Sequence, residues 1–102
     1  MSSIDFCYQV LNIVASIPCG KVTTYGQIAW AVGRPRNARL VGKILSQAAW
    51  YGDYPCHRVV NHAGRTAPGW PEQRGLLEAE GVGFLPNGNV DLKCFLWSGS
   101  ES

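Results

Sequence analysis

The fold is decided by residues 21–47, which read KVTTYGQIAWAVGRPRNARLVGKILSQ. The first four residues, 21–24, form a short extended piece. Thr24 followed three residues later by Gln27 has the form of a capping box, in which a threonine side chain caps the first turn of a helix. A short helix is therefore predicted from Thr24 to about Val32.

The remainder of this stretch predicts a second short helix. Residues 33–35, Gly-Arg-Pro, break the first helix, because proline disfavours a helical residue before it. The second helix then begins near Arg36 or Asn37 and runs to about Gln47. Two short helices joined by a glycine-containing turn form the helix-turn-helix pattern, in which the start of the second helix touches DNA. Helix pairs are common, so the pattern alone does not establish DNA binding.

The distribution of charge supports a face for a polyanion. The net charge is only +2, but no Asp or Glu occurs between Phe6 and Gly52. The same segment carries five basic residues, which are Lys21, Arg34, Arg36, Arg39 and Lys43. A basic first half and an acidic remainder favour DNA binding, whereas an ordinary solvated surface is the alternative for scattered charges. The candidate DNA contacts on the second helix are Arg36, Asn37, Arg39 and Lys43.

Further elements flank the helix-turn-helix. Apolar residues at helical spacing predict a helix from Ser3 to Ile17, and another runs from Pro71 to Glu80 before Gly81 stops it. Residues 82–85 and 90–92 flank a Pro-Asn-Gly-Asn turn, as in a hairpin or wing. The predicted fold class is α+β and mainly helical, a winged-helix-like domain with a helix-turn-helix and a short C-terminal hairpin.

Length and composition place limits on the class of protein. A chain of 102 residues fits one domain, residues 1–102, with residues 98–102 expected as a frayed tail. No apolar run is long enough to span a bilayer, and the N-terminus does not resemble a signal peptide. We therefore expect no membrane partner and a cytoplasmic location, associated with the nucleoid in a bacterium or nuclear in a eukaryote.

The cysteines point to one reactive thiol. The four cysteines form no CxxC pair and no Cys/His cluster with zinc spacing, so no metal site is expected. Without a secretory signal, reduced thiols are expected rather than disulfides. Cys7 and Cys94 lie among apolar residues and are predicted to be small core side chains. Cys56 differs, because it lies within Pro-Cys-His-Arg-Val at residues 55–59.

This short string can support nucleophilic chemistry. A thiol attacks as the thiolate, so a reactive cysteine needs a base or a positive charge nearby. His57 offers the base and Arg58 the charge, although adjacent side chains on an extended segment point apart, so that His57 would act through water. Glu80 is the most plausible carboxylate to orient the histidine. A buried cysteine beside a solvated histidine is the equally plausible alternative.

Residues 55–60 resemble the active-site motif of the O6-alkylguanine-DNA alkyltransferases. Residues 21–45 also resemble the helix-turn-helix of that family, in Thr24 to Ala29, in Gly33-x-Pro35 and in Ala38-Arg39-x-Val41-Gly42. Leu76-Leu77-x-x-Glu80-Gly81 resembles the end of the helix that follows its active site. The resemblance covers nearly the whole chain, in order and at compatible spacing.

The resemblance implies definite roles. Cys56 would take the alkyl group irreversibly from O6-alkylguanine, and His57, through water, and Glu80 would form the relay that raises its thiolate character. Tyr25 would stand beside the flipped base, rotate its phosphate aside and help to protonate the leaving guanine. Arg39 would enter the base stack and fill the gap. The family binds through the minor groove, where little sequence is read.

Further implied contacts shape the base pocket. The backbone carbonyls of Cys56 and Val59 would read the exocyclic amine of guanine, and the loop with Gly69 and Trp70 would close over the alkyl group. No cofactor would be needed, because the protein itself accepts the alkyl group. The implied partner is double-stranded DNA containing O6-alkylguanine, bound by a monomer.

Three features depart from the pattern of the repair enzymes. We expect no amino-terminal domain, since Met1 lies only a helix ahead of the helix-turn-helix. Residues 47–49, Gln-Ala-Ala, stand where an Asn-Pro usually ends the second helix, and the loop over residues 61–71 is shorter. These features resemble the alkyltransferase-like proteins, which bind O6-alkylguanine without repairing it and hand the lesion to nucleotide excision repair. Their cysteine is replaced, whereas this chain keeps Cys56.

Three functions follow from these observations. Alkyl transfer to Cys56 is the favoured prediction. The alternative is a non-enzymatic lesion sensor that recruits nucleotide excision repair proteins. A transcription regulator that uses only the helix-turn-helix is the third, and it leaves residues 55–58 without a purpose.

Overall fold

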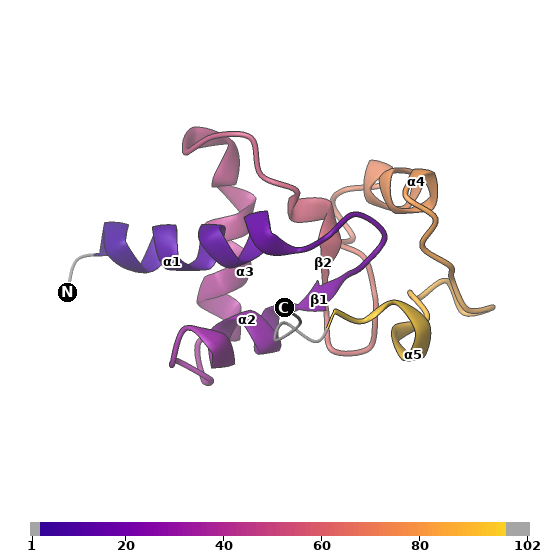
Figure 1. Ribbon diagram of the computed structural model, residues 1–102, viewed down its shortest axis with the longest axis horizontal. Helices are drawn as coiled ribbons and strands as arrows, with labels where there is room; N and C mark the ends of the chain where they lie inside the picture. Colours follow the sequence, from indigo (N-terminus) through magenta and orange to yellow (C-terminus); the bar gives the residue numbers. More distant parts are fainter. Residues whose placement is uncertain (1–2, 98–102) are drawn as a thin grey trace.

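The computed structural model describes residues 3–97, so the tail predicted over residues 98–102 lies outside the described part of the chain. Figure 1 shows α1 crossing α3, with α2 on the same side of the molecule, and α4 and α5 in the other half. The elements in chain order are α1 (Ser3–Ser16), β1 (Thr23–Thr24), α2 (Tyr25–Ala31), α3 (Ala38–Ser46), the 3-10 turns η1 (Ala48–Trp50) and η2 (Cys56–Arg58), β2 (Val59–Val60), α4 (Glu72–Ala79) and α5 (Leu92–Phe95).

The predicted helix-turn-helix is confirmed as α2 and α3. The Thr24 side chain caps α2 by accepting a hydrogen bond from the Gln27 N–H at 3.1 Å. The Gln27 side chain does not return to the Thr24 backbone, because its Oε1 accepts a 3.0 Å hydrogen bond from the Thr23 hydroxyl. The capping box is therefore only half formed, and the other half ties α2 to the strand before it.

The second helix begins later than predicted. The Arg34 N–H bonds to the Ala29 carbonyl, and the Asn37 N–H bonds to the Arg34 carbonyl, so residues 34–37 form a turn. As a result Arg36 lies before the helix, and α3 starts at Ala38 with Asn37 in the capping position but without a side-chain cap.

A two-stranded parallel sheet joins two hydrophobic cores. Thr23 pairs with Val59 and Thr24 with Val60. Because successive strand residues point to opposite faces, Val59 packs into one core and Val60 into the other. The first core lies among α1, α2 and α3, and the second is formed by Val22, Val60, Leu77, Val82 and Val90. The turn that carries Cys56 directly precedes β2, so it lies at the boundary between the two cores.

Two local expectations about residues 56–94 are wrong. Cys56–Arg58 is a 3-10 turn rather than an extended segment, since the Arg58 N–H reaches back to the Pro55 carbonyl at 3.0 Å. Cys94 is exposed on α5 and is not a core side chain. The prediction for Cys94 relied on its apolar neighbours. Because α5 is only four residues long and lies at the surface, part of this apolar segment is exposed.

The C-terminal hairpin is short. It consists of an antiparallel bridge between Phe84 and Val90, with the Leu85 N–H bonded to the Asn89 carbonyl at 2.7 Å. The chain then enters α5 at Leu92 rather than continuing as a strand. The hairpin packs on the second core through Val90.

Gly64 should be the glycine most sensitive to substitution. Its φ is +88°, and a Cβ there would lie 2.6 Å from the Val90 carbonyl oxygen. The Val90 N–H also donates a hydrogen bond to the Gly64 carbonyl. Gly64→Ala should lower the free energy of unfolding by about 2 kcal/mol or more, since a left-handed alanine alone costs about 1–2 kcal/mol. Urea denaturation measures the loss.

Gly26→Ala is the matched control, because Gly26 lies in α2 with open space around its Cβ position. This variant should be as stable as the wild type or slightly more stable. Equal stability of Gly64→Ala and the wild type would contradict the packing described here.

Candidate functional site

Cys56 lines a cavity of about 600 Å³ between the two halves of the molecule. Tyr25 enters from the start of α2, and Trp70 and Gln73 enter from the loop before α4 and from α4 itself. The complete lining is Tyr25, Gly42, Leu45, Ser46, Ala48, Ala49, Gly52, Asp53, Tyr54, Cys56, Ala67, Gly69, Trp70 and Gln73. The structure thus brings together four residues predicted for the pocket, which are Tyr25, Cys56, Gly69 and Trp70.

Burial sets the chemistry of the thiol. It raises the pKa of Cys56 to about 11, so the group is neutral near pH 7. Burial also raises the pKa of the Tyr25 hydroxyl, and the nearby Cys56 adds to this effect. Tyr25 is therefore a protonated hydrogen-bond donor beside the thiol. The pocket keeps both groups in their neutral forms.

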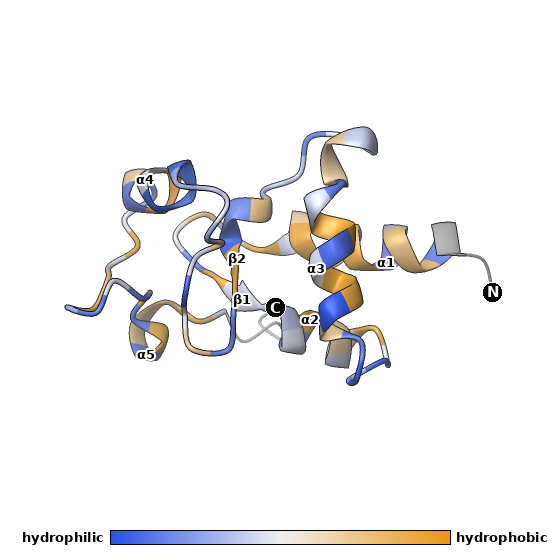
Figure 2. Cartoon of the chain, turned by 180° about the vertical axis from the view of Figure 1, so that it is seen from behind, coloured by the Kyte–Doolittle hydropathy of each residue, from blue (hydrophilic) through white to orange (hydrophobic). Residues whose placement is uncertain are grey.

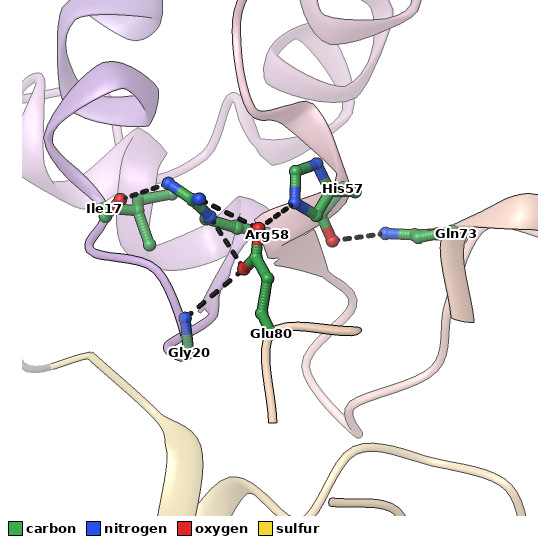
Figure 3. A network of polar contacts seen from close by, with 6 residues as sticks. All are labelled: Ile17, Gly20, His57, Arg58, Gln73 and Glu80. Carbon is green, nitrogen blue, oxygen red and sulfur yellow. Dashed lines mark hydrogen bonds and ion pairs between the residues drawn. The ribbon is translucent and has the colours of Figure 1, made fainter. Parts of the chain in front are cut away.

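Glu80 joins three segments that are distant in sequence (Figure 3). Its carboxylate accepts two hydrogen bonds from Arg58, at 2.9 and 2.8 Å, and one from the Gly20 N–H at 3.3 Å. Arg58 also donates to the Ile17 carbonyl at 2.8 Å. The Arg58 hydrogen bonds, with that of His57, lower the pKa of Glu80 to about 2. Arg58 is thus engaged with Glu80 and does not supply the positive charge that the sequence suggested for Cys56.

The same carboxylate orients His57. The distance from His57 Nε2 to Glu80 Oε2 is 2.7 Å. A carboxylate can only accept, so the hydrogen of the neutral ring lies on Nε2, and Nδ1 is the basic nitrogen. The structure therefore places the predicted pair of His57 and Glu80 in direct contact, with Nδ1 available to accept a proton.

Gln73 is a site residue that the sequence did not reveal. It is buried, and its amide donates to the His57 carbonyl at 3.0 Å and to the Val59 carbonyl at 2.9 Å. Its Oε1 accepts from the Ala67 N–H at 2.7 Å. Gln73 thus ties the turn of the thiol to the loop that carries Trp70. The Val59 carbonyl, predicted to read guanine, already accepts this hydrogen bond from Gln73.

The predicted DNA contacts lie outside the cavity. Arg39 and Lys43 are exposed on α3, Arg36 is exposed in the turn before it, and Asn37 is half-buried. None of these four lines the pocket. Their exposure suits contact with a large external partner rather than with a base inside the pocket.

Within residues 3–97, no group of three or more His, Cys, Asp or Glu side chains could hold a metal ion. The same part of the chain contains no helix that is long and apolar enough to cross a membrane.

The depressed pKa of Glu80 predicts a loss of stability in acid. Because this carboxyl is more acidic in the folded chain than its ordinary value of 4.5, its contribution is present above pH 4.5 and lost as the pH falls toward 2. We expect about 2 kcal/mol from this group, less than the whole shift implies, because some solvent reaches it. Urea unfolding at a series of pH values measures the effect.

Glu80→Gln provides the comparison. It should be less stable than the wild type at neutral pH, because Arg58 loses its counter-charge. The gap in unfolding free energy should narrow between pH 4.5 and 2. Two parallel stability curves over that range would count against the assignment.

The raised pKa of Cys56 predicts slow alkylation. Near neutral pH iodoacetamide should modify the exposed Cys19 well before Cys56. The rate at Cys56 should then rise with pH up to about 11. Peptide mapping by mass spectrometry measures both rates, and preferential modification of Cys56 near neutral pH would refute the neutral-thiol description.

Comparison with known proteins agrees with this geometry. The family described as "6-O-methylguanine DNA methyltransferase, DNA binding domain" matches residues 5–82. A DNA base-flipping protein of Escherichia coli is 44% identical over 97 residues, which cover 92% of this chain and 75% of that protein. A methylated-DNA–protein-cysteine methyltransferase of Shigella flexneri is 38% identical over 83 residues, covering 78% of this chain and 48% of that enzyme.

A solved structure extends the likeness to the fold. The crystal structure of S. pombe Atl1 in complex with damaged DNA containing O6-carboxymethylguanine has a TM-score of 0.85 and 34% sequence identity to this chain. The match covers 96% of this chain and 99% of that protein. By sequence and by fold, the chain belongs to the 6-O-methylguanine DNA methyltransferase family and carries its DNA-binding domain.

Proposed function

We propose that this protein binds duplex DNA, takes an O6-alkylguanine base into the cavity and transfers the alkyl group to Cys56. The observation that carries the proposal is the position of the Cys56 thiol in a cavity of about 600 Å³ that it shares with Tyr25 and Trp70. A base within a duplex cannot reach a thiol in such a pocket, so the damaged nucleotide has to leave the stack.

The transfer is a single displacement. Cys56 Sγ forms a bond to the alkyl carbon as the bond from that carbon to guanine O6 breaks, and the electron pair of the broken bond stays with the purine. The thiol proton passes toward His57 Nδ1, and the Tyr25 hydroxyl donates to the leaving guanine. The product is an unmodified guanine and a stable thioether, so each molecule acts once and needs no cofactor.

Charge on α3 supports the DNA-binding part of the proposal. Arg39 and Lys43 are both exposed on this helix, where they can contact phosphates, and Arg39 can occupy the gap in the stack. S. pombe Atl1, which shares the fold, has been solved with damaged DNA. The loop with Gly69 and Trp70 forms part of the cavity wall and can cover the alkyl group.

A second candidate is a lesion sensor that binds O6-alkylguanine without transfer and recruits excision repair proteins. The observation that favours it is the neutral thiol, whose pKa of about 11 reflects burial, while the Arg58 guanidinium is engaged by Glu80. Residues 47–49, Gln-Ala-Ala, directly after α3, also stand where the repair enzymes usually have an Asn-Pro whose asparagine braces this turn. Such a site could hold the base yet react slowly.

The mass of the intact protein separates the two candidates. After incubation with a duplex that contains one O6-methylguanine, the wild type should gain one methyl group that maps to Cys56. Cys56→Ser should bind the same duplex and gain no mass, because its hydroxyl is a far weaker nucleophile. Peptide mapping identifies the modified residue.

An unchanged mass with tight and selective binding of the lesion duplex would reject the transfer and leave the sensor. Equal binding of lesion and undamaged duplexes would contradict both candidates, because each requires recognition of the damaged base.

A further inference from the structure

Trp50 is the most exposed large apolar side chain of the described residues, with 85% of its surface open to solvent. Trp50 is the last residue of the 3-10 turn η1. The cavity is lined by Ala49 before it and by Gly52 after it, but not by Trp50 itself. The indole therefore stands outside the cavity, beside its rim. Its exposure contributes nothing to the folding of the isolated chain.

The chain continues in the helical sense from α3 to Trp50. The Gln47 N–H bonds to the Ile44 carbonyl, and the Trp50 N–H bonds to the Gln47 carbonyl, both at 3.0 Å. Residues spaced by three and four along such a path share one face. Arg39, Lys43, Ser46 and Trp50 are exposed and have that spacing, and we call them the α3 stripe. Leu40 and Gln47 are exposed beside it. Figure 2 shows hydrophilic residues recurring along α3.

The α3 stripe runs alongside the cavity. Gly42, Leu45, Ser46 and Ala49 from the same helical path form part of its wall. The stripe begins with the cation of Arg39 and ends with the indole, roughly 16 Å further at the rise of a helix. Two cations and an aromatic ring next to a cavity are the elements with which proteins hold unstacked nucleic-acid strands.

We propose that Trp50 contacts DNA directly, packing its indole on a base or sugar of the strand at the cavity rim after the damaged base has left the stack. This inference rests on the proposed function, since flipping exposes the faces on which an indole can pack. DNA is favoured over a protein partner because no Asp or Glu occurs between Phe6 and Gly52, whereas five basic residues do. Asp53 lies on the cavity side of the rim.

Trp50→Ala tests the contact, with Trp30→Ala as the matched control. Trp30 is also exposed, at 74%, but lies on α2 and outside the α3 stripe. Trp50→Ala should weaken binding of a duplex with one O6-methylguanine by about five- to a hundredfold, the range for loss of one stacked aromatic. Trp50→Phe should keep most of the affinity, and Trp30→Ala all of it. Fluorescence anisotropy at fixed salt measures each Kd.

Wild-type affinity after Trp50→Ala, or an equal loss after Trp30→Ala, would overturn the inference. A wild type without preference for the lesion duplex would contradict the proposed function instead. In that case, weaker binding by Trp50→Ala would still support the contact, and unchanged binding would overturn it.

Emission spectra give a second readout that does not depend on the alanine variant. The difference between wild type and Trp50→Phe isolates the emission of Trp50, which stacking on DNA should quench. Emission that stays unchanged at saturating lesion duplex would overturn the contact. Because Trp50 is exposed, the melting temperatures of all three variants should equal that of the wild type, which excludes unfolding as the cause of weaker binding.

Discussion

The carboxylate of Glu80 is the constraint on which the site depends. Arg58 is only 17% exposed, and a guanidinium in that position needs a counter-charge with matching geometry. Glu80 provides both oxygens to it and, with the same oxygens, holds His57 and the Gly20 N–H. One side chain at the end of α4 therefore fixes the loop after α1 and the turn that contains Cys56.

The position of this turn decides which groups face the cavity. Arg58 and His57 are directed toward Glu80, and Cys56 is left as the residue of η2 that lines the cavity. Gln73 fixes the same turn from the other side, through the carbonyls of His57 and Val59. The position of the thiol thus depends on two polar residues, the buried Gln73 of α4 and the partly buried Glu80 at the C-terminal end of that helix.

Burial has opposite effects on binding and on reactivity. A pocket that excludes water can hold a flipped base between apolar walls, but the same exclusion raises the pKa of Cys56 to about 11. Transfer of an alkyl group would therefore require the Cys56 thiol to release its proton toward His57 as the flipped nucleobase arrives. In the proposed function, the choice between lesion sensing and repair therefore depends on how strongly burial of the Cys56 thiol opposes loss of its proton.

The sequence predicted the helix-turn-helix from its capping and helix-breaking residues, and the grouping of Tyr25, Cys56 and Trp70 followed from the resemblance to the alkyltransferase family. It predicted the start of α3 one or two residues too early, because that start depends on a turn at residues 34–37 that local propensity does not determine. The sequence also did not predict the hydrogen bonds of Gln73 or the ion pair between Arg58 and Glu80. Both depend on contacts between residues far apart in the chain, for which a single sequence carries no local signal.

The surface position of Cys94 and the exposure of Trp50 have a similar cause. An apolar residue type shows that a side chain is suited to burial. Only the folded structure shows which apolar side chains remain outside the core. Cys94 is left outside because α5 is a single turn at the surface. Trp50 is left outside the core, with 85% of its surface exposed beside the cavity.

Base flipping into the cavity is the central claim, and the fluorescence of 2-aminopurine placed next to O6-methylguanine in a duplex tests it most directly. This fluorophore is quenched while stacked, so removal of its neighbour from the stack should raise its emission as the protein saturates the duplex. We predict such a rise with the lesion duplex and a much smaller one when guanine replaces the lesion. Saturated binding of the lesion duplex without a rise in emission would contradict the claim.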